Sequence, residues 1–203
     1  MAPPEAVIFD LGKVLVDFDY SIAAHRIAAR ARMTAPDIQA SIDHSPLLFR
    51  FETGRMSREE FFAEVRSTTG FDGTLQEFTE SFADIFTPIE PMVRLHSELR
   101  RAGIPTFIFS NTNELAVGHI RSRFPFFGDF DGYILSYEHG SMKPDDALYD
   151  VVEATTGRRG ASLLYFDDRL ENVKTASGRG WRAVHHISPD ESRKAAQQAG
   201  LLK

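Results

Sequence analysis

The sequence predicts an α/β fold: a Rossmann-like parallel sheet with helices on both faces and a small all-α block inserted near the start. From residue 92 onward, short apolar runs alternate with amphipathic helical patterns, which is typical of a parallel, doubly wound sheet. Another apolar run opens the chain at residues 6–9, and residues 20–87 show helical periodicity without a strand-like run. We therefore expect a core of residues 1–16 and 89–203 and a helical insert at 17–88.

The composition is that of a globular protein and argues against several functions. The chain has 203 residues, of which 42% are apolar, enough for one domain with an insert. A net charge of −6 without a basic stripe argues against nucleic acid as a partner. The lack of cysteine excludes disulfides, thiolate metal sites and a cysteine nucleophile.

The sequence carries no pattern that predicts secretion or membrane insertion. The first residues do not combine a basic segment with a long apolar run. No apolar run approaches the roughly 18–20 residues that span a bilayer. We expect a cytoplasmic protein without membrane contact, present as a monomer or weak dimer.

The first apolar run is predicted to be a buried strand that ends in an aspartate. Residues 6–9 lead directly into Asp10, and Gly12 follows two residues later. Ligands of open parallel sheets bind outside the carboxyl ends of the strands, so Asp10 stands where chemistry is commonly done. A strand-ending aspartate can also cap a following helix, and this segment alone leaves both interpretations open.

The insert is predicted to hold roughly four helices. Pro36 suits a helix start, Ser57 and Glu60 form a capping box, and Thr74 is a candidate cap. Three residues are predicted to lie on a loop of the insert, where they either face a substrate or are simply solvated: Arg50, Phe51 and Glu52.

The second half of the chain is predicted to supply four more buried strands. The apolar runs that indicate them lie at residues 106–109, 133–136, 163–166 and 182–186. Helical patterns precede, separate and follow them, beginning near residues 92, 115, 145, 170 and 190. This alternation makes the strands parallel, so their carboxyl ends are expected at one edge of the sheet.

Polar residues suited to phosphate chemistry follow three of the five predicted strands. They are Asp10, Ser110-Asn111 and Asp167-Asp168, and Lys143 lies on the loop after a fourth strand. An aspartate can attack phosphorus and form an aspartyl-phosphate, while a lysine can offset the charge of phosphate oxygens. Two carboxylates and a loop carbonyl are hard oxygen ligands that suit Mg²⁺.

The ordered set of motifs resembles the haloacid dehalogenase (HAD) superfamily. The motifs are FDLGKVLVD around Asp10, FSNTN around Ser110, GSMKPDDALY around Lys143 and FDDRLEN around Asp167-Asp168. The resemblance covers the whole chain, including a helical cap between the first two motifs as in type-1-capped members. The residues of these motifs are similar to those of the branch that contains bacterial α-D-glucose-1-phosphate phosphatase, and to those of the N-terminal phosphatase domain of soluble epoxide hydrolases.

The resemblance implies a magnesium site. Asp10 matches the nucleophile, which is also a metal ligand, and Gly12 matches the position whose backbone carbonyl binds the metal. Asp168 matches the acidic ligand, and Asp167 is a candidate second or water-mediated ligand. The expected cofactor is therefore Mg²⁺.

The resemblance also implies a phosphate site and a reaction. Ser110 matches the phosphate-binding hydroxyl, Asn111 follows it as a further substrate-binding residue, and Lys143 matches the charge-balancing lysine. The implied activity is hydrolysis of a small phosphorylated metabolite, a sugar phosphate first, through an aspartyl-phosphate.

Gly12 departs from the pattern. Most phosphatases of the superfamily carry an aspartate there, which protonates the leaving oxygen and then activates water, and glycine cannot transfer a proton. One interpretation is a phosphatase whose leaving group needs little protonation, assisted by water, Asp17 or a cap residue. The others are a 2-haloacid dehalogenase and a catalytically weak or inactive phosphate- or partner-binding protein. The Asp167-Asp168 pair favours metal-dependent phosphate chemistry over metal-free dehalogenation.

Overall fold

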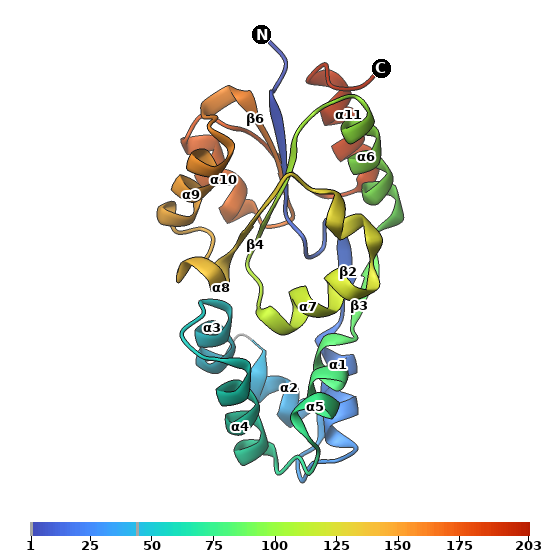
Figure 1. The fold of residues 1–203 in the computed structure, drawn as a ribbon, viewed down its shortest axis with the longest axis vertical. Helices are drawn as coiled ribbons and strands as arrows, with labels where there is room; N and C mark the ends of the chain where they lie inside the picture. Colours follow the sequence, from blue (N-terminus) through green and yellow to red (C-terminus); the bar gives the residue numbers. More distant parts are fainter. Residues whose placement is uncertain (1, 44) are drawn as a thin grey trace.

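A five-stranded parallel sheet lies at the centre of the larger of two packed units (Figure 1). The computed structural model describes residues 2–43 and 45–203, so Met1, where the predicted core begins, lies outside the described residues. The strand order is β5-β4-β1-β6-β7. The strands have the following bounds: β1 Ala6–Phe9, β4 Thr106–Ser110, β5 Gly132–Leu135, β6 Leu163–Asp167 and β7 Arg182–His185.

The opening strand is the middle of this sheet. β1 pairs in parallel with β4 on one side and with β6 on the other. Its side chains are fully buried on both faces, which explains why its sequence is a continuous apolar run rather than an alternating one. The predicted parallel α/β core is confirmed, and the end of β1 delivers Asp10 to the middle of the carboxyl edge.

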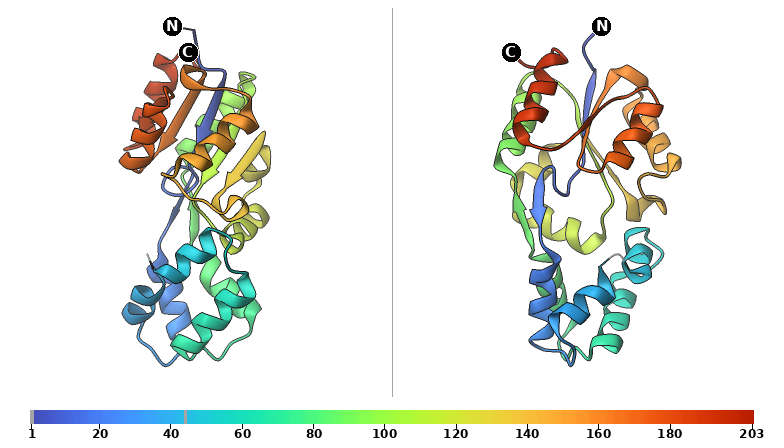
Figure 2. Two further views of the ribbon diagram at one scale, coloured as in Figure 1. Left: turned by 90° about the vertical axis from the view of Figure 1, so that its left-hand side faces the viewer. Right: turned by 180° about the vertical axis from the view of Figure 1, so that it is seen from behind.

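Helices cover both faces of the sheet (Figures 1 and 2). Val7 and Phe9 of β1 point to one face, and Ala6 and Ile8 point to the other. The first face is covered by α6 Glu90–Arg101, α7 Glu114–Arg123 and α11 Pro189–Gln198. The second is covered by α9 Asp146–Thr156 and α10 Leu170–Gly178. Each apolar side chain buried here stabilises the fold by about 1.5–3 kcal/mol relative to an exposed one.

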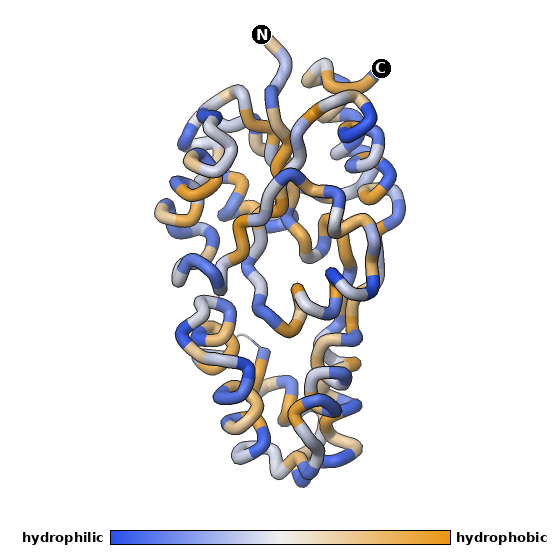
Figure 3. Tube along the Cα trace, viewed as in Figure 1, coloured by the Kyte–Doolittle hydropathy of each residue, from blue (hydrophilic) through white to orange (hydrophobic). Residues whose placement is uncertain are grey.

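Five helices form the second unit, between β1 and α6 in the chain. They are α1 Tyr20–Ala28, α2 Ala35–Ile42, α3 Pro46–Glu52, α4 Arg58–Thr69 and α5 Leu75–Ala83. Their apolar faces turn inward (Figure 3), where Phe51 stacks on Phe61 with ring centroids 4.4 Å apart. The capping box of Ser57 with Glu60 is confirmed, and Thr74 caps α5 as predicted.

Helix α3 was not predicted. The prediction of a loop at residues 50–52 is wrong, because these residues form the last turn of α3. Ser45 caps this helix by accepting a hydrogen bond from the Leu48 N–H, and Pro46 occupies its first turn. A serine followed by proline is a helix-start signal, so the sequence held the information. The consequence is that Glu52 lies at the C-terminal end of a helix.

A short two-stranded ladder joins the two units. β2 Val16–Phe18 and β3 Phe86–Pro88 pair in antiparallel register. The segment that leaves the core and the segment that returns to it therefore lie side by side. No periodic pattern predicted β3, because a three-residue strand ending in proline is too short to show periodicity. Helix α8 Ser136–His139 follows β5 on the side that faces the insert (Figure 1).

Within residues 2–43 and 45–203, no helix combines the length and the apolar character needed to cross a bilayer.

Candidate active site

The carboxyl edge of the sheet and the helical insert enclose a cavity of about 790 Å³. Loops that follow β1, β4, β5 and β6 line the sheet side with most of the residues predicted from the motifs: Asp10, Gly12, Ser110, Asn111, Lys143 and Asp168. The insert supplies the opposite wall, which includes Asp19, Tyr20, Gln39, Asp43 and Glu52. Residues far apart in the chain are therefore brought to one space.

Asp10 is held in place by hydrogen bonds to one of its oxygens. Its side chain follows β1 and is 7% exposed. Oδ1 accepts a hydrogen bond of 2.7 Å from the Leu11 N–H and lies 3.0 Å from Lys143 Nζ. A carboxylate with one oxygen fixed in this way presents its other oxygen in a defined direction, which is what an attacking group requires.

Lys143 is buried between two carboxylates. Its Nζ lies 3.0 Å from Asp10 Oδ1 and 2.7 Å from Asp167 Oδ2, and it donates to the Phe109 carbonyl at 2.9 Å. The ammonium is 5% exposed, so these three oxygens replace its hydration. The lysine is therefore fixed as a positive charge beside Asp10.

Asp167 is a fully buried anchor for this lysine. Besides Lys143, its carboxylate accepts hydrogen bonds from the Tyr165 hydroxyl, the Arg169 N–H and the Asn172 amide. Both of its oxygens are thereby occupied. Tyr165 in this role was not anticipated, because a tyrosine within an apolar strand reads as core.

Burial and charge act against each other in this group. Burial raises the pKa of Asp10 well above its ordinary value, and Asp167 and Asp168 add to the increase, while the Lys143 ammonium acts in the opposite sense. Burial acts to lower the pKa of Lys143, but the two carboxylates outweigh it and the pKa is raised. Lysine 143 is thus always charged, and Asp10 needs further positive charge nearby to remain ionised.

Three carboxylates meet at the edge of this group. Asp10, Asp167 and Asp168 each offer an oxygen, and these atoms lie within 4.8 Å of one another. Asp168 is half-buried and lines the cavity, and its carbonyl is 2.9 Å from His185 Nε2. With the oxygens of Asp167 already engaged, the geometry leaves Asp10 and Asp168 as the carboxylates available to a metal ion, a hard-oxygen set that suits Mg²⁺.

Ser110 and Asn111 end β4 beside Lys143. The Ser110 hydroxyl is 2% exposed and borders the cavity. The Asn111 amide donates to the Lys143 carbonyl at 2.9 Å and accepts from the Lys143 N–H at 2.7 Å. Asn111 thus lines the cavity while both ends of its side-chain amide hold the Lys143 backbone.

Comparison with known proteins places the chain in a family. The family of haloacid dehalogenase-like hydrolases matches residues 4–178. This protein is a haloacid dehalogenase-like hydrolase. Among curated relatives, the sesquiterpene phosphatase astK of Aspergillus oryzae is 25% identical over 89% of both chains. The D-ribitol-5-phosphate phosphatase of Bacteroides thetaiotaomicron is 23% identical over 82% of this chain and 84% of its own.

Solved structures share the fold. The HAD family enzyme bt-2542 of Bacteroides thetaiotaomicron, in complex with magnesium and inorganic phosphate, superposes with a TM-score of 0.77 at 21% identity, covering 88% of this chain and 91% of its own. L-2-haloacid dehalogenase from Xanthobacter autotrophicus gives 0.64 at 20% identity, covering 98% and 86%. The fold thus serves both carbon–halogen and phosphate enzymes, and the site must decide between them.

In this HAD-like hydrolase, position 12 has no room for a side chain. A Cβ built on Gly12 would stand 2.8 Å from the Cε1 atom of the Phe18 ring. Phe18 belongs to β2 and packs on Tyr20 and Phe86, with Lys13 Nζ over its ring. The glycine is therefore matched to its surroundings, and an aspartate there would have to displace an aromatic ring.

Asp17, one of the candidate substitute acids, does not line the cavity. Its exposed carboxylate accepts a hydrogen bond from Lys13 Nζ at 2.5 Å and another from the Phe18 N–H. The hydrogen bond from Lys13 is the main cause of a lowered pKa, so the group holds its charge rather than a proton. The structure does not bring Asp17 to the site.

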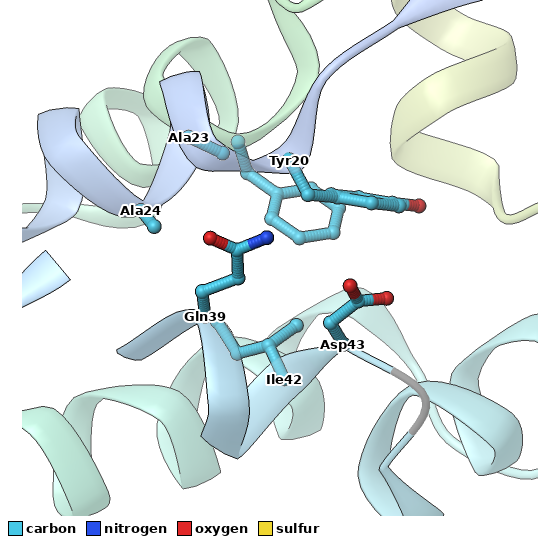
Figure 4. A pocket seen from close by; sticks show the side chains of 7 residues that line it. Tyr20, Ala23, Ala24, Gln39, Ile42 and Asp43 are labelled. Atoms are coloured by element: carbon cyan, nitrogen blue, oxygen red, sulfur yellow. The ribbon is translucent and has the colours of Figure 1, made fainter. Parts of the chain in front are cut away.

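The insert lines the far end of the cavity of this HAD-like hydrolase with polar groups. Between α1 and α2, Tyr20, Gln39 and Asp43 also border a small pocket of about 10 Å³ that opens into the insert (Figure 4). Glu52 lines the cavity from the end of α3, and burial raises its pKa to about 7 with a further contribution from Asp43. Sequence reasoning assigned no role to Gln39 or Asp43, because polar residues on insert helices carry no motif.

Proposed function

We propose that this protein is a Mg²⁺-dependent phosphomonoester hydrolase that acts through an aspartyl-phosphate on Asp10. One observation carries the proposal: Asp10 lies 3.0 Å from a buried lysine and beside Asp168, in the cavity between the sheet edge and the insert. The names of the curated relatives, both phosphatases, agree with it. In this proposal residues 1–16 and 89–203 form the catalytic core and residues 17–88 form the cap.

The proposed roles follow from the contacts. Asp10 attacks phosphorus, while Lys143 neutralises phosphate oxygens and Ser110 donates a hydrogen bond to one of them. Two unit charges 4 Å apart repel by about 4 kcal/mol at an effective dielectric constant near 20, so an anionic nucleophile and an anionic phosphate need positive charge between them. Lys143 supplies one such charge, and Asn111 and Asp167 hold it in position.

The metal ion would be held by Asp10, Asp168 and the backbone carbonyl of Gly12. When bound, the ion supplies a second positive charge for the phosphate oxygens and lowers the pKa of Asp10. The donor set fits, because two carboxylate ligands with substrate oxygens and water are a common Mg²⁺ environment. Asp167 is proposed to act on Lys143 and at most on a metal-bound water, since Lys143, Tyr165, Arg169 and Asn172 already donate to it.

The proposed substrate is a small polyhydroxylated phosphate, a sugar phosphate first. The insert faces the cavity with carboxylates and an amide, at Asp19, Gln39, Asp43 and Glu52. These groups can accept hydrogen bonds from substrate hydroxyls, whereas an isoprenoid chain would displace water from them without supplying any hydrogen bond. Similarity of the motifs to the glucose-1-phosphate phosphatase branch supports the same choice.

The test is phosphate release from p-nitrophenyl phosphate with Mg²⁺ and with a chelator. We expect release that requires Mg²⁺ and that Asp10→Asn reduces by at least about 10³-fold, because the nucleophile is lost. A panel of phosphorylated sugars then identifies the preferred substrate. If wild type and Asp10→Asn are equally silent, the protein is a binding protein. Chloride release from 2-chloropropionate without metal would instead establish a dehalogenase.

A further inference from the structure

The proposed function leaves a proton unaccounted for. When Asp10 displaces an alcohol from phosphorus, the departing oxygen carries negative charge and must gain a proton. When water then attacks the aspartyl-phosphate, the water must lose one. Gly12 cannot do either, and the Phe18 ring fills the space beside it.

The candidates for this task are the carboxyl groups that line the cavity outside the metal group. Asp19 is one, but its carboxylate caps α1 by accepting from the Ser21 N–H, and the Ser21 side chain together with this N–H lowers its pKa. Asp43 lies further into the insert, at the small pocket with Tyr20 and Gln39 (Figure 4). Glu52 remains, at the C-terminal end of α3, which packs against α8 of the core.

Glu52 is fixed over the catalytic loops by contacts of its own backbone. Its carbonyl accepts a 2.6 Å hydrogen bond from the buried Ser136 hydroxyl at the start of α8. The same hydroxyl accepts from the Thr112 N–H at 2.9 Å, in the loop that begins at Ser110. Ser136 thus joins the end of α3 to the loop that follows β4. Helices α3 and α8 lie next to each other in Figure 1.

A glycine two residues after Glu52 lets the insert approach α8 closely. Gly54 has a φ of 64°, and a Cβ at this position would stand 2.0 Å from the Tyr137 carbonyl oxygen. The two backbones therefore approach closely here, and a side chain at position 54 would keep them apart. The position of Glu52 relative to the core is therefore set by the fold.

The environment of the Glu52 carboxyl suits a proton carrier. Within the described residues, it has no hydrogen-bond or ion-pair partner, and Glu52 is half-buried where it lines the cavity. The groups that act on its charge are Asp43 of the insert and Arg169, which follows Asp168. A carboxyl that is shielded from water and faces one acid and one base can hold and release a proton near neutral pH.

We propose that Glu52 is the general acid and base of this hydrolase, supplied by the cap in place of the residue missing at position 12. In the first step an Asp10 oxygen bonds to phosphorus, the bond from phosphorus to the leaving oxygen breaks, and that oxygen takes the Glu52 proton. In the second step water bonds to phosphorus, its proton passes to the Glu52 carboxylate, and the Asp10–phosphorus bond breaks. Phosphate leaves, and Glu52 is protonated again. The inference rests on the proposed phosphatase activity.

The experiment compares Glu52→Gln with wild type on two kinds of leaving group. p-Nitrophenolate is a stable anion that departs without a proton, whereas the alkoxide of a sugar phosphate is not. We expect Glu52→Gln to release about one equivalent of p-nitrophenol in a rapid burst at the wild-type rate and then to turn over slowly. On the best alkyl phosphate of the panel it should lose about 10²–10⁴-fold in kcat, the usual contribution of general acid–base catalysis, and show no burst.

Two further variants separate a chemical role from a structural one. Glu52→Asp keeps a carboxyl and should recover part of the kcat on alkyl phosphate. Glu59→Gln, on the exposed start of α4, should match wild type on both substrates. The burst should leave a phosphorylated Asp10 that peptide mass spectrometry detects in Glu52→Gln.

The possible results have distinct meanings. If Glu52→Gln loses activity equally on both substrates without a burst, or mainly raises KM, Glu52 binds substrate or shapes the cavity and the inference is wrong. It is also wrong if the variant matches wild type, or if wild type hydrolyses p-nitrophenyl phosphate and no alkyl phosphate at all. Failure of wild type to release any phosphate would refute the proposed function itself.

Discussion

The ring of Phe18 occupies the space that a side chain at position 12 would need. A Cβ atom at Gly12 would lie 2.8 Å from Cε1 of this ring. The absence of an acid at Gly12 is therefore built into β2 as well as into the motif.

This relationship predicts the outcome of restoring the acid. Gly12→Asp should destabilise the protein by about 1–3 kcal/mol, the usual cost of overpacking, and should not raise kcat. Adding Phe18→Leu should recover at least half of the stability. Urea unfolding measures both. Gly128→Asp, at a glycine with open space around it, should stay within about 0.5 kcal/mol of wild type. A stable Gly12→Asp single variant would contradict the steric argument.

Lys143 is predicted to be as important for stability as for activity. Lys143→Met leaves Asp10 and Asp167 as buried carboxylates without a counter-charge, which should cost about 3–5 kcal/mol and abolish phosphate release. Asp167→Asn added to Lys143→Met should restore part of the stability but none of the activity. Denaturant unfolding and phosphate release test this, and a double variant no more stable than Lys143→Met would argue against the pairing.

Asn111 is expected to position the lysine. Asn111→Ala removes both hydrogen bonds to the Lys143 backbone, so kcat should fall about 10–100-fold, by analogy with the loss of other positioning contacts, while KM changes little. Steady-state kinetics separate the two constants. An unchanged kcat with a higher KM would instead support the substrate-binding role that the motif implied.

Asp168 is expected to link metal binding to stability. Saturating Mg²⁺ should raise the Tm of wild type, by about 2–4 °C for each kcal/mol of binding energy in a chain of this size, and a chelator should reverse it. Asp168→Asn should remove this response, whereas Asp129→Asn, an exposed change away from the cavity, should keep it. Differential scanning calorimetry provides the measurement. A Mg²⁺ response that survives in Asp168→Asn would place the ion elsewhere.

His96 gives a pH dependence that is independent of catalysis. It lies under Phe130 with ring centroids 3.9 Å apart, and burial lowers its pKa to about 4. Between pH 4 and the ordinary histidine value near 6.5, the unfolded chain binds a proton that the folded chain does not, so stability falls as pH falls. We expect a loss on the order of 1–3 kcal/mol from this residue.

Unfolding in urea at pH 4.5 and 7.5 tests this, with His96→Gln as the comparison. The variant should be less stable at pH 7.5, because the stack is lost, but less sensitive to the change in pH. An equal pH response in both proteins would show that other groups dominate the acid sensitivity.

The parts of the fold that could be predicted are those that repeat a local rule. β1 was expected at its observed bounds because a strand buried on both faces is a continuous apolar run. The site at the carboxyl edge followed from parallel topology, and Asp10, Ser110, Lys143 and Asp168 do meet there. Strand order and the ladder of β2 with β3 depend on pairings between distant segments, which no local pattern encodes.

The parts of the site that could not be predicted depend on tertiary contacts. Nothing in a run such as Leu-Leu-Tyr-Phe marks Tyr165 as a donor to Asp167, and Glu52 carries no motif. The substrate-binding role predicted for Asn111 stays a prediction, but its two hydrogen bonds to the Lys143 backbone could not be foreseen, because they form only where the two loops meet. Side-chain roles of this kind follow from where loops converge.

The separate interiors of the two units have a consequence for evolution. α1–α5 pack around their own apolar cluster, which Leu115 of the core also joins, while Asp10 follows the central strand of the sheet. A substitution at Gln39 or Asp43 therefore changes the shape of the ligand space without disturbing the packing beneath the nucleophile. Single substitutions in the insert can therefore change which substrates fit, while the packing around Asp10 stays the same.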